Sequence, residues 1–325
     1  MTEVLVATPL RNAAVTRPYD FVDGISIRKL SPILWDKSIV KGYISEHQRA
    51  EMERTAYWLC ASKDSDAGND LFTKARNAAW ALQVICPTGA PHVFLKFQKT
   101  DDGYDNTTAE QPRELCGTLL GGLLSVEKQG LERDFEAVYF GITRAFREKA
   151  VRLQNPILLI EHGMQIGHAP LGSLMFVMGL DMLFMAGEAE AFIKRVGGFL
   201  GVDSYVFPAT YRGIQPNTIV KDVVSDLYEF RNIIAHGQEV PKSPYRQSAD
   251  LISTDGLRMN YDDRCRVDLM LESSLFMLTA SIRKVFVGDL FDKVNNTESW
   301  RWQLRLYEHR YKEAGGPEAK QRRGR

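Results

Sequence analysis

The sequence predicts a mainly α-helical protein: a helical bundle in the C-terminal half and a smaller α+β region before it. Two observations carry this prediction. From about residue 131 onward, apolar residues recur at helical spacing over long segments, whereas the earlier part mixes Pro, Gly and short β-type runs. At 325 residues the chain can form two domains with buried cores. We expect an α+β region of unassigned role over residues 1–140, a helical domain over 141–312 and a disordered basic tail over 313–325.

The N-terminal region is expected to contain a few short strands and two helices. Its expected strands are the β-type runs Val4–Val6 and Gly24–Arg28 and the alternating run His92–Phe97. Its expected helices are Glu46–Lys63 and Asp70–Ile85, which carry apolar residues at helical spacing. Lys99 to Thr108 is polar and is expected to form a loop.

The C-terminal region is expected to contain six helices. They span Glu132–Val151, Ser173–Ala186, Glu190–Leu200, Thr218–His236, Asp263–Asn295 and Ser299–Lys312. The second is apolar nearly all round, which is typical of a core helix. Its four methionines fall on one stripe that predicts a packed helix–helix seam: Met175, Met178, Met182 and Met185. The longest has a heptad-like apolar face: Leu271, Leu275, Leu278, Ile282 and Val285.

Charge and cysteine content narrow the function classes. Forty-one basic and forty-one acidic residues cancel, so the global charge does not argue for nucleic-acid binding. Residues 300–325 hold eight Lys or Arg against three Glu, which is typical of a solvated tail. The four cysteines are scattered without a C-x-x-C pair, which excludes a familiar zinc module and a dense disulfide framework.

No membrane association is expected. The first residues lack the basic and apolar regions of a signal peptide. The longest apolar stretch, Leu174–Ala186, is too short to span a bilayer and contains Asp181. We therefore expect a cytoplasmic protein.

Two further groups of residues allow more than one interpretation. Glu161, His162 and His168 suggest a metal site, but the histidines are six apart on different helical faces, so no metal is expected. Trp300 and Trp302 beside Arg301 and Arg305 are suited to base stacking and phosphate binding, although helix packing is the favoured interpretation.

The most informative stretch is Arg231-Asn232-Ile233-Ile234-Ala235-His236-Gly237, at the end of an expected amphipathic helix. Asn232 precedes His236 by four residues and so shares its helical face. Arg231 lies five residues before His236, roughly 140° around an α-helix. The two side chains converge only if His236 occupies a frayed last turn, which Gly237 favours as a C-terminal cap.

Three pieces of the chain resemble the ApeA-like branch of the HEPN superfamily, within a bundle of about residues 145–295. Gly179–Phe184 resembles the family's first core helix, and Phe192–Leu200 resembles the basic–apolar helix that follows. Asp226–Gly237 resembles the closing R-N-x3-H motif, the specific part of the match. Asp181 stands where the family more often has Glu. The N-terminal half has no such resemblance.

The resemblance implies a metal-independent endoribonuclease, a hydrolase used in prokaryotic antiviral defence or as a toxin. His236 would act as acid or base, because imidazole gains and loses a proton near neutral pH. Arg231 would stabilise the phosphate with paired N–H donors, and Asn232 would orient the imidazole or the phosphate. The expected partners are RNA, a second copy of the chain and a regulatory protein; no cofactor is expected.

In HEPN proteins two copies of the motif face each other across a two-fold axis, so one cleft receives both histidines. The methionine stripe and the heptad-like face are the expected dimer interface. The alternative is a non-catalytic HEPN scaffold or a nucleotide- or RNA-binding module. The simplest interpretation is purely structural: Arg231 caps the helix or forms a salt bridge, and His236 only interacts favourably with the helix dipole.

Asp181 is expected to pair with Arg231 or to orient His236. An isolated carboxylate in so apolar a helix destabilises the fold unless it has a partner. The competing expectation is that Asp181 simply reaches solvent at the helix edge.

Overall fold

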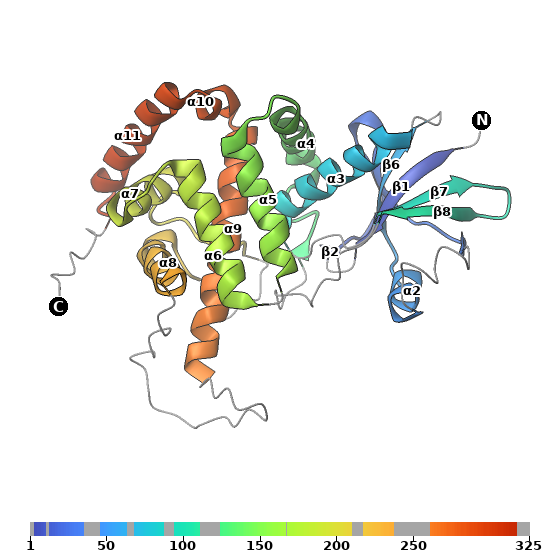
Figure 1. The fold of residues 1–325 in the computed structure, drawn as a ribbon, viewed down its shortest axis with the longest axis horizontal. Coiled ribbons are helices and arrows are strands. Elements are labelled where there is room, and N and C mark those ends of the chain that lie inside the picture. Colours follow the sequence, from blue (N-terminus) through green and yellow to red (C-terminus); the bar gives the residue numbers. More distant parts are fainter. Residues whose placement is uncertain are drawn as a thin grey trace. The chain divides into compact units, whose positions relative to one another are not determined.

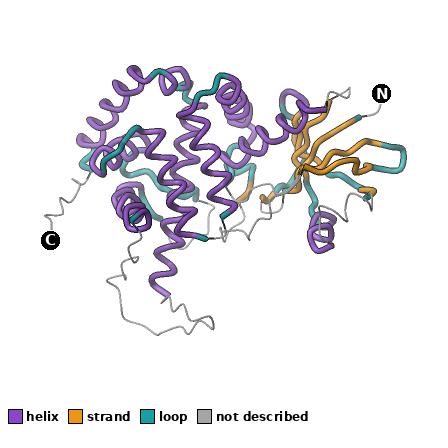
Figure 2. The backbone as a smooth tube through the Cα atoms, in the orientation of Figure 1, coloured by secondary structure: helices purple, strands orange, loops and turns teal. Residues whose placement is uncertain are grey.

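The computed structural model describes residues 3–10, 13–35, 46–63, 68–87, 94–110, 124–166, 168–209, 217–236 and 261–316. These residues divide into two compact units between Arg144 and Ala145, close to the expected boundary at residue 140. The first unit contains a sheet and the second is helical (Figures 1 and 2). The predicted fold class, mainly α with a smaller α+β N-terminal region, is confirmed at this level. Of the predicted tail, residues 317–325 lie outside the described residues.

A seven-stranded sheet forms the centre of the first unit. In spatial order its strands are β3 (Tyr19–Asp20), β4 (Ile25–Arg28), β6 (Trp58–Lys63), β1 (Val4–Pro9), β7 (Phe94–Lys99), β8 (Tyr104–Glu110) and β5 (Ile33–Leu34). Neighbours are antiparallel except for the parallel pair β5 and β8. A separate parallel pair joins β2 (Ala13–Ala14) to β9 (Leu124–Ser125). All six residues of β1 are buried, because β1 is a central strand covered on both faces.

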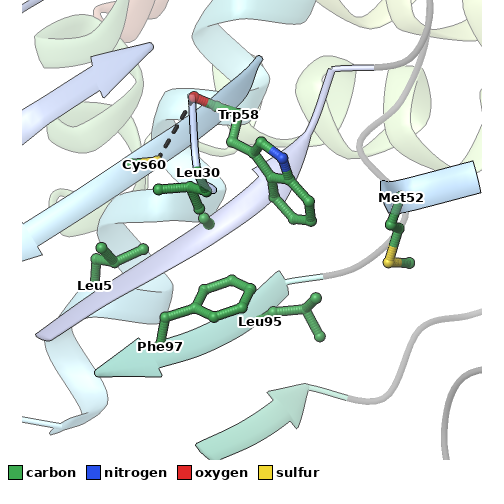
Figure 3. Packing of buried hydrophobic residues seen from close by; sticks show 8 residues of the cluster. Leu5, Leu30, Met52, Trp58, Cys60, Leu95 and Phe97 are labelled. Carbon is green, nitrogen blue, oxygen red and sulfur yellow. Dashed lines mark hydrogen bonds between the residues drawn. The ribbon is translucent and has the colours of Figure 1, made fainter. Parts of the chain in front are cut away.

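Helices complete this unit. On one face of the sheet, Phe97 meets Trp58 edge to face and Met52 of α2 (Glu46–Glu53) joins the cluster, as Figure 3 shows. Helix α3 (Gly68–Ile85) packs on β1 and β6. In α4 (Leu131–Arg147), Phe135 stacks on Phe21. The expected strands at Val4, Gly24 and His92 correspond to β1, β4 and β7, although His92 itself lies outside the described residues.

Two expectations for this unit are wrong. The helix expected over Glu46–Lys63 ends at Glu53, and Trp58–Lys63 is strand β6. A short apolar run that is buried on both faces lacks the alternation that identifies a strand. The loop expected from Lys99 to Thr108 is instead a hairpin, in which the Thr100 N–H donates to the Gly103 carbonyl at 2.8 Å before β8.

The second unit is a helical bundle. Its helices are α5 (Val151–Gln165), α6 (Ala169–Phe184), α7 (Ala189–Leu200), α8 (Val220–Ala235), α9 (Tyr261–Val287), α10 (Phe291–Asn295) and α11 (Thr297–Glu313). The sequence did not predict α5, which contains Pro156 and Gly163. Gly163 allows α5 to approach α6, since a Cβ there would lie 2.4 Å from the Phe176 ring.

Two further expectations for the helices are corrected. The helix expected over Glu132–Val151 ends at Arg147, and Lys149 has a positive φ of 54°. The helix expected over Asp263–Asn295 ends at Val287, before a turn with Asp289 at φ 52°.

Of the two surfaces expected to form a dimer interface, the α9 face is buried and the α6 methionine stripe is partly exposed. The heptad-like face of α9 is buried inside this chain, so it is not available to a second copy. The methionine stripe does not form the expected packed seam: Met178 and Met182 are each 41% exposed. The reason is that α6 buries its other face, which carries Phe176, Leu180 and Leu183.

Among the described helices, none is by itself both long and apolar enough to cross a membrane. Only α6 and α7 taken together meet the length and composition, and they are bent by 81° at the break between them.

Candidate functional site

Asp181 lies on the last turn of α6, and neighbouring helices hold that turn. The last carbonyl groups of a helix have no partner inside it. The buried Trp300 indole of α11 donates its N–H to the Leu183 carbonyl at 2.7 Å. The end of α6 is thereby joined to a helix more than a hundred residues further along the chain.

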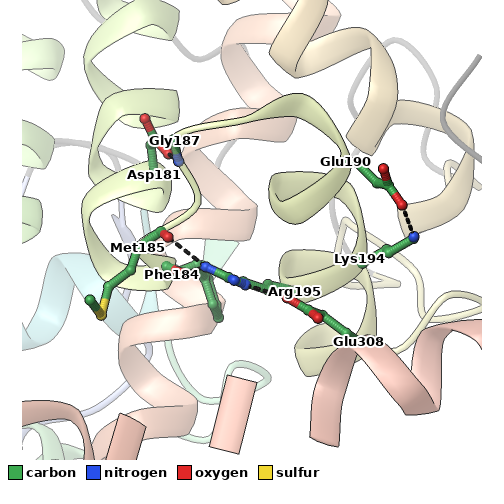
Figure 4. Close-up of polar contacts among 8 residues, drawn as sticks. All are labelled: Asp181, Phe184, Met185, Gly187, Glu190, Lys194, Arg195 and Glu308. Carbon is green, nitrogen blue, oxygen red and sulfur yellow. Dashed lines mark hydrogen bonds and ion pairs between the residues drawn. The ribbon is translucent and has the colours of Figure 1, made fainter. Parts of the chain in front are cut away.

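Arg195 of α7 holds the same end of α6. Its guanidinium donates to the carbonyl oxygens of Phe184 and Met185 and pairs with Glu308 of α11 at 2.6 Å, as Figure 4 shows. A cation at a helix C-terminus also interacts favourably with the helix dipole. The backbone that carries Asp181 is therefore fixed in position by α7 and α11.

The turn between α6 and α7 is held from both sides. The Gly187 N–H donates to Asp181 Oδ1 at 2.8 Å, and the Tyr228 hydroxyl of α8 donates to the Gly187 carbonyl at 3.0 Å. Gly187 has a φ of 67°, a left-handed conformation that glycine adopts without strain. These bonds connect Asp181 to α8, where the motif lies.

Arg231 closes this arrangement into a ring of contacts. Its Nη2 lies 3.6 Å from Asp181 Oδ2, its Nη1 donates to Asn232 Oδ1 at 2.7 Å, and its guanidinium lies 5.3 Å above the Tyr228 ring. We call Asp181, Gly187, Tyr228, Arg231 and Asn232 the Arg231 cluster. The structure thus brings Asp181 to Arg231, as the sequence led us to expect.

Asn232 does something other than expected. Its side-chain oxygen accepts from Arg231 and so orients the guanidinium, whereas the sequence suggested that it would orient the imidazole or a phosphate. The Arg231 guanidinium has five N–H donors. One is bonded to Asn232, and the contact to Asp181 is too long for a hydrogen bond. The buried Nε has no hydrogen-bond partner among the described residues.

His236 lies at the end of α8, outside the Arg231 cluster. It is the C-terminal cap residue, with φ −95° and ψ 8°, and its backbone N–H donates to the Asn232 carbonyl at 3.0 Å. Its side chain is exposed. Within the described residues no hydrogen bond or ion pair joins the imidazole to Asp181, Arg231 or Asn232. Gly237, the expected cap, lies outside the described residues.

Charge and burial define what the cluster can do. Burial raises the pKa of the Tyr228 hydroxyl; the Arg231 charge lowers it, and Asp181 and Glu188 raise it. The hydroxyl therefore remains protonated and continues to donate to Gly187 at neutral pH. Arg231 is 27% exposed at its side chain. The cluster consequently presents an oriented, partly exposed guanidinium, which is suited to binding an anion such as a phosphate.

Sequence reasoning missed Tyr228 and Gly187. Tyr228 lies three residues before Arg231, on the same helical face, and this spacing was a usable signal. The role of Gly187 depends on the turn between two helices, which no local pattern specifies.

The other candidate residues lie on α5, at the start of α6 and on α11. His168 caps α6, its Nδ1 accepting from the Leu171 N–H at 3.4 Å. His162 lies within α5. In the part of the chain that the structure describes, no group of three or more His, Cys, Asp or Glu side chains is arranged to hold a metal ion. Trp300 is buried, as the packing interpretation expects, but Trp302 is 62% exposed.

A cavity of about 470 Å³ opens near the start of α8. Its lining includes Asp222, Asp226 and Met270 and none of the Arg231 cluster. Two carboxylates at its wall disfavour an anionic ligand. The cavity is therefore separate from the Arg231 cluster in both position and charge.

No protein-family model, curated protein or solved structure matches this chain.

Proposed function

We propose that this chain is a metal-independent endoribonuclease with a HEPN-type bundle, in which Arg231 binds the scissile phosphate and His236 transfers protons. The observation that carries the proposal is the orientation of Arg231. Asp181, Asn232 and Tyr228 hold its guanidinium at the end of the helix that also ends in His236. A charge positioned before the substrate binds stabilises a transition state without reorganisation at the moment of reaction.

The reaction follows from these two groups. The ribose 2′-oxygen attacks the neighbouring phosphorus while a base removes the 2′-hydroxyl proton. The bond from phosphorus to the 5′-oxygen breaks, and an acid gives that oxygen a proton. The products are a 2′,3′-cyclic phosphate and a 5′-hydroxyl. Arg231 interacts with the non-bridging oxygens as negative charge accumulates on them.

A second copy of the chain would supply the second proton-transfer group. His236 is the only histidine of the motif, and acid and base must act on opposite sides of the phosphate. Along one side, α6 exposes Leu171, Met178 and Met182. An exposed apolar stripe of this kind supports a contact between copies.

The test is cleavage of RNA by the purified full chain in excess EDTA. We expect cleavage to persist, with cyclic phosphate at the 3′ ends. His236→Ala should abolish it. Arg231→Lys should reduce it by at least about a hundredfold, because a point charge cannot reproduce paired donors. His168→Asn is the matched control, since it removes a histidine but keeps a cap for α6.

Cleavage by purified His236→Ala protein would refute the nuclease assignment. A cellular version of the test is expression toxicity: the wild-type chain should impair growth as a toxin or defence nuclease does, and His236→Ala should relieve the impairment.

One observation favours a different function, an RNA- or nucleotide-binding module without catalysis. Among the described residues no hydrogen bond or ion pair joins the His236 imidazole to the Arg231 cluster, so phosphate binding by Arg231 does not by itself imply chemistry. In that case RNA would bind without being cut, and Arg231→Lys would weaken binding while His236→Ala would leave it unchanged.

A further inference from the structure

Helix α11 presents an exposed face that the proposed active site does not use. Its buried face consists of Trp300, Leu304, Tyr307 and Tyr311. At 100° per residue, Trp302 lies almost opposite this buried face. Trp302 is 62% exposed, and Leu306, one turn later, is 37% exposed. Tryptophan combines a large apolar ring with a polar N–H and is enriched at binding interfaces.

Cations flank this aromatic ridge. Arg301 and Arg305 lie along one side of Trp302 and Arg310 along the other. All three are exposed, and none forms an ion pair with a carboxylate among the described residues. Of the acidic residues of α11, Glu308 is paired with Arg195 and Glu313 lies 3.3 Å from His309, while Glu298 is exposed one turn before Trp302.

Positive charges also approach each other on both sides of the helix. Arg152 of α5 donates to Thr297 Oγ1 at 3.0 Å and to the Val294 carbonyl, which holds it at the start of α11. Partial burial and the nearby Arg301 charge lower the pKa of Arg152. Burial and the Arg310 charge likewise lower the pKa of Lys284 in α9. A bound anion would relieve this repulsion.

We infer that this face of α11 is a second contact surface for single-stranded RNA, with Trp302 stacking on a base and Arg301 and Arg305 binding the phosphates beside it. The inference rests on the proposed function for the identity of the nucleic acid. A stacking ring between cations suits a single strand, because every base has a face to stack and every nucleotide carries a phosphate. The surface has too few apolar side chains for a membrane-binding helix, which needs a continuous apolar face.

The surface also connects with the Arg231 cluster. Trp300 and Glu308 fasten α11 to the last turn of α6 and to Arg195, and that turn carries Asp181. The helices that carry the two proposed contacts are therefore joined, in part through Arg195 and Glu308 (Figure 4). Binding at α11 would retain the RNA while Arg231 acts on one phosphate.

The experiment measures the affinity of the full chain for a fluorescent single-stranded 2′-O-methyl oligouridylate, whose blocked 2′-oxygens prevent cleavage. Trp302→Ala should weaken binding about tenfold, the loss of one stacked base, and Trp302→Phe should retain most of the affinity. The double variant Arg301→Gln, Arg305→Gln should lower the slope of log affinity against log salt by about one to two. Arg147→Gln, another exposed arginine, is the control. Thermal unfolding establishes that each variant is folded.

The outcomes separate this inference from the nuclease proposal. If His236→Ala does not change cleavage, but Trp302→Ala weakens oligonucleotide binding, the nuclease proposal fails and the α11 surface stands. If Arg231→Lys weakens binding and Trp302→Ala does not, the α11 inference is overturned. The inference is also overturned if the wild-type chain does not bind the oligonucleotide. It is overturned too if the Trp302 and Arg301/Arg305 variants bind phosphatidylserine vesicles less tightly but bind the oligonucleotide as tightly as the wild-type chain does.

Discussion

Asp181 has two different partners, one for each carboxylate oxygen. Oδ1 accepts the Gly187 N–H, and Oδ2 faces Arg231. The first contact shapes the turn after α6, and the second places a charge beside the guanidinium. Asp181 is therefore best described as a positioning residue: it orients Arg231 and also partly neutralises it.

Substitution of Asp181 by Asn should separate these effects. The amide oxygen can still accept from Gly187, but the charge facing Arg231 is lost. We expect RNA affinity to hold or rise, because the guanidinium loses a competing anion. The cleavage rate should fall about tenfold, equivalent to ~1.4 kcal/mol of lost positioning. Single-turnover rates and oligonucleotide affinities check this, and a parallel fall in both would contradict it.

His236 lies at the end of α8 with an exposed side chain. The sequence predicted that it would lie at the end of a helix, and it does so as the C-terminal cap of α8. Its exposed side chain has no partner in the Arg231 cluster among the described residues.

At the scale of elements, the contact between α7 and α11 depends on a glycine. A Cβ at Gly198 would lie 1.9 Å from the carbonyl oxygen of Tyr307, and backbone cannot move aside as a side chain can. Gly198 lies in α7, three residues after Arg195, which fastens the end of α6. Loss of this close approach would disturb both the helix pair and the clamp on Asp181.

Gly198→Ala should therefore destabilise the second unit by ~2 kcal/mol or more, as measured by urea unfolding. Gly179→Ala is the comparison. Its added Cβ would lie 2.8 and 3.3 Å from the two methyl groups of Leu278, at the end of a flexible side chain, and 3.5 Å from the Pro156 Cα, which is an ordinary contact. Helix propensity favours alanine by about 1 kcal/mol, so this variant should lose less stability. Equal losses in the two variants would refute the argument.

At the scale of the whole molecule, a second copy is the proposed partner of the α6 stripe. Met178→Lys combined with Met182→Lys should convert a dimer to a monomer, because charges would enter an apolar contact. The fold should survive, since both side chains are exposed. Cleavage should fall with the dimer. Light scattering after size exclusion and an RNA assay measure both effects.

The control for this prediction is Val151→Lys, which charges an apolar residue of α5 that is 58% exposed. It should change neither mass nor cleavage. A wild-type chain that is monomeric and still cuts RNA would remove the composite site while leaving the roles of Arg231 and His236 intact.

Alkaline pH should destabilise both units. Burial raises the pKa of the Cys60 thiol from 9.0 to about 12 and raises those of Tyr228, Tyr307 and Tyr311 above 10.0. These groups are neutral when protonated, so their stabilisation is complete below the ordinary pKa values. It is lost as pH rises from those values through the folded-state pKa values.

The free energy of unfolding should therefore fall between about pH 9 and pH 11. Tyr307→Phe should make that fall shallower, because one buried ionisable hydroxyl is removed. Tyr205→Phe, which alters an exposed tyrosine, should leave it unchanged. In the native state Cys60 should resist thiol reagents at about pH 8, since it is almost wholly protonated.

Much of the architecture was already determined by the sequence. Helical periodicity predicted α3, α7, α8 and α11 to within a few residues, because each is long and buries one stripe of apolar side chains. The pairing of Asp181 with Arg231 was also predictable. A carboxylate in an apolar helix needs a counter-charge, and Arg231 was one of the two partners that the sequence suggested for it.

Only the tertiary structure decided the remainder, because it depends on contacts between distant segments. Strand β6 and helix α5 lack a local signal: β6 is buried on both faces, and α5 tolerates Pro156 and Gly163 through its packing on α6. The same holds for which apolar stripe stays exposed, that of α6 or that of α9, and for which tryptophan stays exposed, Trp300 or Trp302. Which face of a helix is buried depends on the elements that pack against it, so the sequence of that helix alone does not determine it.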